Sequence, residues 1–254
     1  MDSINSQIPY AVFAEDVSEQ SLANDIAERL HLPLISSNEA IDGNLYLKIQ
    51  NGSLCLTDGS LSFSGDFSDK SKRLSYSNLS HELLIKAVKI KGRGTDLNIL
   101  DATAGMGEDS ILLAAYGFDV TLFEYNPYIA ELLRDTLRRS QSIPALSSIT
   151  ERMHLNSGDS VSAMREMTQK YDVVFLDPMF PERQKTSLVK KKFQLIHKLE
   201  QPCANEKEML DAALNSATVK VVVKRPAKGP YIANAKPNYS IEGNSIRYDC
   251  YLLI

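Results

Sequence analysis

The apolar run VVFL is followed directly by a loop that combines an acid, a main-chain acceptor and an aromatic ring, Asp177-Pro178-Met179-Phe180-Pro181. The Asp177 carboxylate and the Pro178 carbonyl can accept the two hydrogens of an exocyclic NH₂ group. Held in this way, the amine nitrogen would point its lone pair toward an electrophile. Phe180 could stack on the ring that carries the amine, as aromatic side chains stack on unpaired bases. We therefore predict that Asp177, Pro178 and Phe180 are catalytic residues acting on an amino group of a planar ring.

A glycine turn, Asp101-Ala-Thr-Ala-Gly105-Met-Gly107, lies between the apolar run LNIL and a helix expected to start near Asp109. Glycines let the backbone approach a ligand, and the first N–H groups of a helix have no partner within it. NAD-binding turns carry a third glycine in the pattern GxGxxG, whereas Ser110 occupies that position here. Asp101 would repel a pyrophosphate but suits a positively charged amino-acid moiety. The turn thus favours S-adenosylmethionine over NAD as the cofactor.

Two further polar positions follow later strands. Glu124 closes the run DVTLFE, where a carboxylate can accept both hydroxyls of an adenosine ribose. The turn Ser157-Gly158-Asp159-Ser160 precedes the next helical stretch, and we expect it beside the adenine edge. The cofactor-binding residues predicted up to this point are Asp101, Gly105, Gly107, Glu124, Asp159 and Ser160.

Short apolar runs separated by helical stretches dominate the chain after residue 70. The runs LNILDA, DVTLFE, YDVVFLDP and VKVVVKRP are rich in β-branched residues, as expected of buried parallel strands in βαβ units. The final RYDCYLLI adds one more strand. We predict an α/β fold, a Rossmann-like class I methyltransferase with a mostly parallel, seven-stranded, doubly wound sheet, over residues 71–254.

The first 70 residues are predicted to form a small N-terminal α+β appendage. The stretch SEQSLANDIAERLHL places Leu22, Ile26 and Leu30 on one helix face. The stretch NLYLKIQNGSLCLTDGSLSFSG alternates apolar and polar residues and contains Asn51-Gly52 and Asp58-Gly59, which are strong hairpin-turn dipeptides. The expected domains are therefore 1–70 and 71–254.

Charge is unevenly distributed in this 254-residue chain, whose net charge is −4. Residues 1–70 carry eleven Asp and Glu against three Lys and Arg, whereas residues 181–230 carry eleven Lys and Arg against five acids. The basic part flanks the Asp177 loop and the following strand, so we expect it to form a rim that faces an anionic partner. The predicted RNA-binding residues are Lys185, Lys190, Lys191, Lys192, Lys224 and Arg225.

The three cysteines, Cys55, Cys203 and Cys250, are far apart and form no CxxC pair, and the four histidines are scattered. This spacing predicts a reduced compartment and no metal site. The N-terminus lacks the basic and apolar regions of a signal peptide, and apolar runs are too short to span a bilayer. We expect a cytoplasmic protein without a membrane partner, either a monomer or a weak dimer.

Three segments carry a resemblance to a known family. The Asp177 loop resembles the (Asp/Asn)-Pro-Pro-(Tyr/Phe) motif of methyltransferases that modify adenine N6, cytosine N4 or guanine N2. Together, DATAGMGED, LDPMFPERQKTSLVKKK and VVVKRPAKGPYIANAKPN resemble the ribosomal RNA small subunit methyltransferase J family over roughly residue 72 to the end. The resemblance implies methyl transfer from S-adenosylmethionine to N2 of a guanine in 16S ribosomal RNA, with the RNA or the small subunit as partner.

The resemblance also implies cofactor contacts at Glu108, Asp109 and Tyr125, besides Glu124, Asp159, Ser160 and Asp177. The family usually has arginine where this chain has Glu108 and Tyr125, and its glycine-rich segment is replaced here by Lys72-Arg73-Leu74-Ser75-Tyr76-Ser77. Alternatives remain open at this point. A similar acceptor loop serves adenine-N6 or protein-glutamine methylation, and a non-catalytic RNA-binding ribosome-assembly factor could keep the same fold.

Overall fold

The computed structural model describes residues 8–35, 44–70, 72–178, 193–199 and 202–253. The chain divides into two compact units. The first comprises residues 1–66, 126–139 and 179–202, and the second comprises residues 67–125, 140–178 and 203–254.

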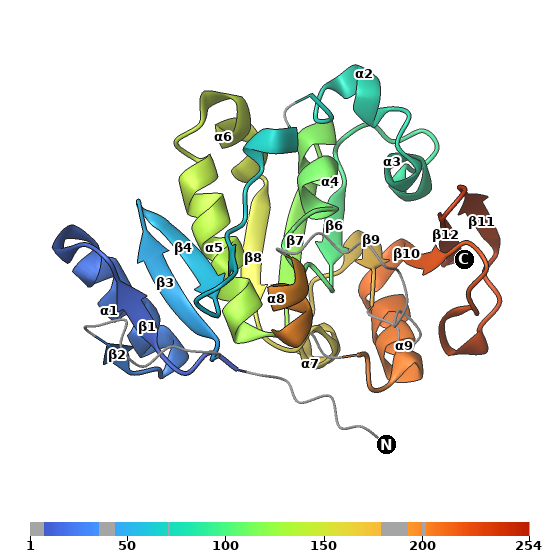
Figure 1. The fold of residues 1–254 in the computed structure, drawn as a ribbon. Coiled ribbons are helices and arrows are strands. Elements are labelled where there is room, and N and C mark those ends of the chain that lie inside the picture. Colours follow the sequence, from blue (N-terminus) through green and yellow to red (C-terminus); the bar gives the residue numbers. More distant parts are fainter. Residues whose placement is uncertain (1–7, 36–43, 71, 179–192, 200–201, 254) are drawn as a thin grey trace. The chain divides into compact units, whose positions relative to one another are not determined.

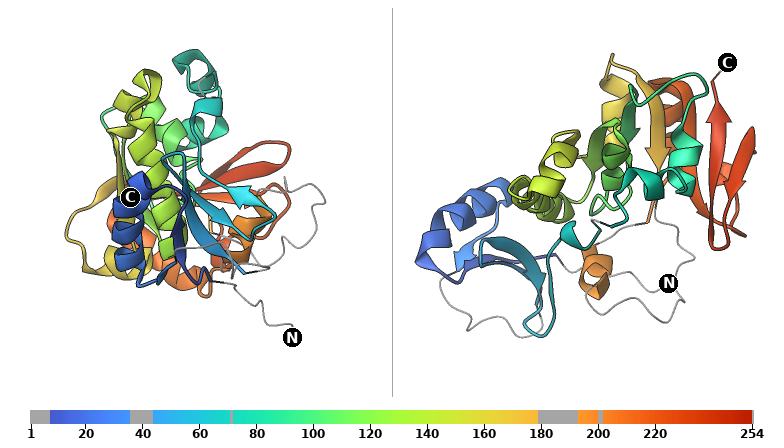
Figure 2. Two further views of the ribbon diagram at one scale, coloured as in Figure 1. Left: turned by 60° about the vertical axis from the view of Figure 1, so that its left-hand side comes forward. Right: turned by 90° about the horizontal axis from the view of Figure 1, so that it is seen from above.

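The second unit is built on a seven-stranded sheet with the order β11-β12-β10-β9-β6-β7-β8 (Figure 1). The strands are β6 (Asn98–Asp101), β7 (Asp119–Glu124), β8 (Met153–Ser157), β9 (Tyr171–Leu176), β10 (Ala217–Pro226), β11 (Tyr239–Glu242) and β12 (Ile246–Leu252). Strands β8, β7, β6, β9 and β10 are parallel, whereas β12 pairs antiparallel with β10 and with β11. Figure 2 shows the β11–β12 hairpin, in red, at one edge of this sheet. The predicted mostly parallel α/β fold is confirmed.

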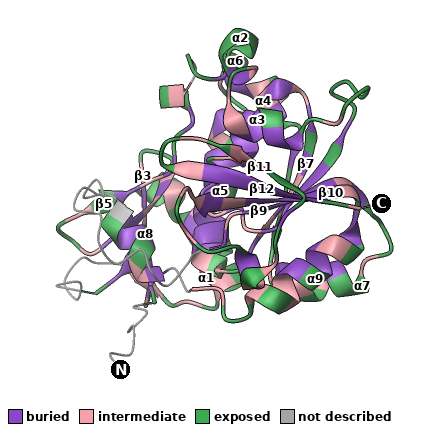
Figure 3. Cartoon of the chain, turned by 90° about the vertical axis from the view of Figure 1, so that its right-hand side faces the viewer, coloured by how far each residue is buried: buried purple, intermediate pink, exposed green. Residues whose placement is uncertain are grey.

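The central strands form because their residues are apolar and β-branched on both faces. Val173, Val174, Val221, Val222 and Val223 are all fully buried, which is the pattern of parallel strands covered by helices on both sides. Figure 3 shows these central strands as buried. Leu100, Val174 and Val221 belong to one core cluster that includes side chains of α9. The second unit thus has a continuous core around β6, β9 and β10.

Short helices connect the strands of the second unit: α2 (Tyr76–Leu79), α3 (Leu83–Val88), α4 (Ser110–Tyr116), α6 (Pro144–Thr150), α7 (Ser160–Glu166) and α9 (Glu206–Ser216). Strand β6 lies between β9 and β7, so the chain leaves β6 toward one side and returns on the other. The crevice at the carboxyl ends of the strands beside such a reversal is where doubly wound folds bind ligands. The ends of β6, β7 and β9 are therefore where we expect a candidate site.

The first unit contains a five-stranded sheet with the order β2-β1-β3-β4-β5. Its elements are β1 (Val12–Ala14), α1 (Gln20–Leu30), β2 (Leu34–Ile35), β3 (Tyr46–Gln50), β4 (Ser53–Thr57), β5 (Ser62–Phe63), α5 (Pro127–Ser140) and α8 (Phe193–Leu199). The predicted helix and hairpins are present. Strands β1 and β2, which pair in parallel, were not predicted because two or three residues are too few to show an alternating pattern.

The turn between β3 and β4 has the conformation that its sequence predicts. Asn51 and Gly52 both have positive φ, at 51° and 71°, as the two central residues of a type I′ hairpin turn require. On α1, Ala23, Ile26 and Ala27 are buried, while Leu22 and Leu30 are half-buried. The local pattern therefore located the buried face of this helix to within one residue.

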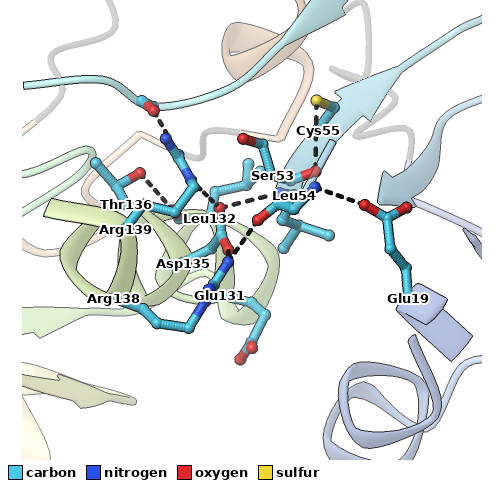
Figure 4. A network of polar contacts seen from close by, with 12 residues as sticks. Glu19, Ser53, Leu54, Cys55, Glu131, Leu132, Asp135, Thr136, Arg138 and Arg139 are labelled. Carbon is cyan, nitrogen blue, oxygen red and sulfur yellow. Dashed lines mark hydrogen bonds and ion pairs between the residues drawn. The ribbon is translucent and has the colours of Figure 1, made fainter. Parts of the chain in front are cut away.

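A buried acid on α5 connects this helix to the small sheet (Figure 4). Asp135 accepts the Leu54 N–H at 2.9 Å, Arg139 Nε at 2.7 Å and an Arg138 guanidinium nitrogen at 2.7 Å. Arg139 also donates to the Gly65 carbonyl at 2.6 Å. Because Asp135 is only 4% exposed, these donors stabilise a charge that would otherwise be costly to bury.

Within the part of the chain that the structure describes, no helix is long and apolar enough to cross a membrane.

Candidate functional site

Parallel pairing brings the polar ends of neighbouring strands together. Asp101, the last residue of β6, is in register with Phe175 on β9 and Leu122 on β7. Glu124, the last residue of β7, is in register with Ser157 on β8. Asp177 follows β9 directly. The acids that the sequence singled out after separate strands therefore lie along one edge of the sheet.

The glycine turn after β6 is fixed to the end of β7. Ala104 N–H donates to the Phe123 carbonyl at 2.9 Å, and Gly105 N–H donates to the Glu124 carboxylate at 2.8 Å. Gly105 and Gly107 have φ values of 54° and 73°, which side chains other than glycine rarely adopt. A Cβ placed on Gly105 would meet nothing within 4 Å. The turn thus keeps its backbone open toward a ligand, as the predicted cofactor requires.

The buried carboxylate of Asp101 holds this turn in place through hydrogen bonds. Its carboxylate accepts the Ser110 hydroxyl at 2.5 Å and the Thr103 N–H at 3.1 Å, and it is 1% exposed. Burial raises the pKa of Asp101 to about 7, although the bonds from Ser110 and Thr103 work in the opposite direction. Thr103 in turn accepts the Asp177 N–H through its hydroxyl oxygen at 2.7 Å. Asp101 and Thr103 therefore link the glycine turn to the loop after β9.

The carboxylates of Glu124 and Asp159 both accept hydrogen bonds from backbone N–H groups. Glu124 is buried and binds Gly105, and its own carbonyl accepts the Gly158 N–H at 2.9 Å. Asp159 is the N-cap of α7 and accepts the N–H groups of Val161 and Ser162. Burial would raise the pKa of Asp159, but the bonds from Ser162 and Val161 lower it. Ser160 is buried in the first turn of this helix.

Tyr125 and Glu108 differ in how far they are constrained. Tyr125 is 65% exposed, next to the buried Glu124. Glu108 forms an ion pair with Lys70 in the same unit. A ligand that contacts the glycine turn would therefore meet Glu108, which is half-exposed and already paired with Lys70. It would also meet the exposed ring of Tyr125.

Lys224 on β10 bridges two acids of the site. Its ammonium lies 2.5 Å from Asp109 Oδ2 and 2.9 Å from Asp177 Oδ2. Burial by itself lowers the pKa of Lys224, but the two carboxylates outweigh it and raise the pKa. Tyr248 is buried beside this group, and burial together with Asp109 raises the pKa of its phenol. The charged side chain of Lys224 thus connects the N-terminus of α4, through Asp109, to the loop after β9, through Asp177.

The neighbouring Arg225 is also turned into the protein. It is 2% exposed, and its guanidinium donates to the Pro230 carbonyl at 2.7 Å and to Glu206 at 3.1 Å. The sequence predicted Lys224 and Arg225 as RNA contacts, whereas the structure places both in internal ion pairs. The remaining predicted RNA contacts, Lys185, Lys190, Lys191 and Lys192, lie outside the described residues, as does Phe180.

Several supporting residues escaped the sequence reasoning. Thr103 and Tyr248 were not singled out, Ser110 was noted only for standing in place of a third glycine, and the inward role of Lys224 was missed. The available signal was the position of Lys224 at the carboxyl-terminal half of a strand, beside the strand that carries Asp177. Pro178 is described and buried. Among the described residues, no group of three or more His, Cys, Asp or Glu side chains could hold a metal ion.

Comparisons with known proteins agree with this geometry. A family model described as "Putative SAM-dependent methyltransferase" matches residues 26–253. A Pseudomonas aeruginosa protein named Ribosomal RNA small subunit methyltransferase J is 38% identical over 98% of this chain and 96% of its own length. A Marinobacter nauticus protein of that name is 44% identical over 67% of this chain, a match that spans 62% of the relative. A crystallised SAM-dependent methyltransferase from Neisseria gonorrhoeae superposes with a TM-score of 0.73, at 27% identity over 95% of both chains.

The fold and the glycine turn define an S-adenosylmethionine-dependent methyltransferase of the Rossmann-like class. Within that class, the chain belongs to the ribosomal RNA small subunit methyltransferase J family. S-adenosylmethionine is its cofactor, and the open turn at Gly105, with Glu124 beneath it, fits that group.

Proposed function

We propose that this protein transfers a methyl group from S-adenosylmethionine to N2 of a guanine in 16S ribosomal RNA. The observation that carries the proposal is the double anchoring of Asp177. Its N–H is bound by Thr103 and its carboxylate by Lys224, so the loop that begins with Asp177 and Pro178 has a fixed starting point. The name of the relatives supports ribosomal RNA as the substrate.

The chain's own residues hold the amine in a reactive position. The Asp177 carboxylate and the Pro178 carbonyl each accept one N–H of the guanine amine, which orients the nitrogen lone pair toward the methyl group. The cofactor supplies an electrophilic methyl bound to a sulfonium. Transfer of that methyl to the amine would leave the electron pair of the carbon–sulfur bond on sulfur, and Asp177 and Pro178 would keep the nitrogen aligned for it. The methylated amine then loses a proton, so no base needs to remove that proton before the attack.

The donor is held by the edge that the glycine turn and Glu124 form. Glu124 binds the Gly105 N–H and, in our proposal, also accepts from the ribose hydroxyls. The remaining predicted donor contacts are Asp101, Gly107, Glu108, Asp109, Tyr125, Asp159 and Ser160. Phe180 stacks on the guanine ring, and Lys185 with Lys190–Lys192 binds the RNA backbone. The protein acts in the cytoplasm, where ribosomes are assembled, as a monomer or a weak dimer.

Product mapping tests the proposal. Purified protein is incubated with labelled S-adenosylmethionine and small ribosomal subunits from a strain that lacks the corresponding methyltransferase, and the RNA is digested to nucleosides. We expect the label in N2-methylguanosine. Label in N6-methyladenosine or in protein glutamine would replace guanine with one of the alternative acceptors. Donor binding without transfer to RNA or protein would indicate an RNA-binding assembly factor.

A further inference from the structure

A strongly basic segment of the second unit has no role in the methyl-transfer step proposed above, although its first residue, Lys70, pairs with Glu108. Residues 70–94 carry seven Lys and Arg and a single acid, Glu82, in a chain whose net charge is −4. The segment contains α2 and α3, and both helices pack on α4 (Figure 1). A local excess of positive charge on an otherwise acidic protein marks a surface for an anionic partner.

Most of these cations are exposed and lack acidic partners. Lys72, Lys86, Lys89 and Lys91 are exposed, and no carboxylate among the described residues forms an ion pair with any of them. Glu82, the acid of the segment, is bound by the Arg73 guanidinium through two hydrogen bonds of 2.6 and 2.9 Å. The pair lowers the pKa of Glu82 and neutralises its charge. The lysine charges are therefore left to act on a partner.

The same segment carries an exposed aromatic ring. Tyr76 on α2 stacks on Tyr116, with ring centroids 5.0 Å apart and an interplanar angle of 18°. Their hydroxyls lie 3.2 Å apart, and Tyr116 packs in turn against Phe118. Tyr76 remains 64% exposed. One face of its ring is covered by Tyr116, so the opposite face is held in place and open to solvent.

Lys89 joins the two features. Its ammonium lies 4.6 Å from the centroid of the Tyr116 ring, within the range of a cation–π contact. Burial would raise the pKa of the Tyr116 phenol, but Lys89 and the Tyr76 hydroxyl lower it. Tyr76, Tyr116 and Lys89 are thus tied into one group, with Lys86 and Lys91 close to Lys89 in sequence. We call Lys72, Tyr76, Lys86, Lys89 and Lys91 the basic–aromatic surface.

We propose that the basic–aromatic surface binds an unpaired segment of the RNA substrate, with a base stacked on Tyr76 and the backbone phosphates on the lysines. A fixed aromatic face among cations is the arrangement that binds single-stranded RNA, because every base has a π-face and every linkage a negative charge. A folded acidic protein could pair with the lysines, but it would offer no planar base to stack on the open face of the Tyr76 ring. The inference rests on the proposed function for its choice of RNA, and it adds a contact separate from the Lys190–Lys192 run.

Binding of a short labelled single-stranded RNA, measured by fluorescence anisotropy over a range of KCl concentrations, tests the surface directly. Tyr76→Ala is expected to weaken binding roughly 5- to 100-fold, and Tyr76→Phe to keep near wild-type affinity. The triple change of Lys72, Lys86 and Lys89 to Gln is expected to reduce the slope of log affinity against log salt by about 2. Lys207→Gln, which removes an exposed lysine on α9, is the matched control and should leave the affinity unchanged within about twofold.

Two readouts separate this proposal from the proposed function. If the variants bind RNA like the wild type while the protein still methylates RNA, the surface is refuted and the proposed function stands. If the wild type methylates no RNA but loses RNA affinity on Tyr76→Ala, the surface stands and the proposed function fails. Binding of polyglutamate, a polyanion without bases, is measured as a further comparison. Equal binding of polyglutamate, together with no effect of Tyr76→Ala on RNA, would make the surface a general polyanion site and would overturn the base-stacking contact.

Discussion

At the scale of single residues, one cation organises the acids of the site. Lys224 contacts Asp109 and Asp177, while Asp101 lies one layer deeper and is bound by Ser110 and Thr103. The two bridged acids lie against the ammonium, whereas burial raises the pKa of Asp101 to about 7. Residues of one type thus have different roles because their partners differ.

Asp177→Ala should abolish methyl transfer while S-adenosylmethionine affinity stays within about tenfold of the wild type. The carboxylate is proposed to position the amine, and loss of that positioning costs on the order of 100-fold or more in rate. Single-turnover transfer and calorimetry measure the two quantities. Asp211→Ala on the exposed face of α9 serves as the control, and near-normal turnover of Asp177→Ala would rule out the positioning mechanism.

Lys224→Met should lower the turnover number roughly 10- to 100-fold. Without the ammonium, the Asp109 and Asp177 carboxylates repel each other and the loop after β9 loses its side-chain anchor. Lys224→Arg keeps the charge and should recover part of the rate. If Lys224 instead contacted RNA phosphate, Lys224→Met would raise the KM for RNA and leave the turnover number intact, so steady-state kinetics with varied RNA distinguish the two roles.

Asp101 gives the protein a pH-dependent stability. Its pKa is raised from 3.8 to about 7, so the folded state retains a proton that the unfolded chain has already lost above pH 4. Stability from this group is therefore full below about pH 4 and declines as pH rises toward 7. Asp101→Asn should flatten that decline in urea unfolding curves recorded at pH 5 and pH 8. An unchanged difference between the two pH values would show that Asp101 ionises freely in the folded protein.

At the scale of elements, helix termini and buried acids fix where loops begin. Asp159 caps α7, and Asp101 fixes the turn that leads into α4. In the first unit, α5 carries Glu131 and Asp135 on its buried side. Glu131 pairs with Arg29 of α1 at 2.6 Å, and Asp135 binds the backbone of β4. The same helix therefore stabilises α1 and the small sheet through separate acids.

Asp135→Ala should destabilise the protein by about 2–4 kcal/mol. The change leaves the Leu54 N–H without its acceptor and removes the carboxylate that Arg138 and Arg139 share (Figure 4). Urea unfolding followed by circular dichroism measures the loss. Asp25→Ala on the exposed side of α1 is the matched control and should change stability by less than about 0.5 kcal/mol.

At the scale of the whole molecule, the uneven charge distribution suggests that the basic segments supply affinity for RNA and that other residues carry out the reaction. The chain is acidic overall, yet its basic residues are concentrated in residues 181–230 and 70–94. Phosphate contacts supply affinity that does not depend on base identity. In the proposed function, selection of the base is then left to Asp177 and Phe180.

Replacing Lys190, Lys191 and Lys192 together with Ala should raise the KM for ribosomal RNA and reduce the salt slope by about 2 to 3. Donor affinity and the identity of the methylated base should remain those of the wild type, because the lysines are proposed to contact only the backbone. Methylation assays at several KCl concentrations provide the test. Wild-type RNA affinity and salt slope in the triple variant would mean that the RNA path runs elsewhere.

The sequence alone determined the features that depend on near neighbours in the chain. Apolar runs predicted β6, β7, β9, β10 and β12 of the large sheet but not β8 or β11. Asn51-Gly52 predicted a hairpin turn. The positions of Asp101, Gly105 and Gly107 after a strand favoured the cofactor. These predictions succeeded because periodicity, turn conformation and the order of strand and turn are local properties.

The tertiary structure decided which charged side chains are committed within the protein. Lys224 and Arg225 look alike in the sequence as basic residues after an apolar strand, yet both turn inward because Asp109, Asp177 and Glu206 come from other parts of the chain. Tyr76 likewise became a candidate contact only through its stacking on Tyr116, far away in sequence. Such pairings depend on how strands and helices are brought together, and a one-dimensional pattern does not contain those distances.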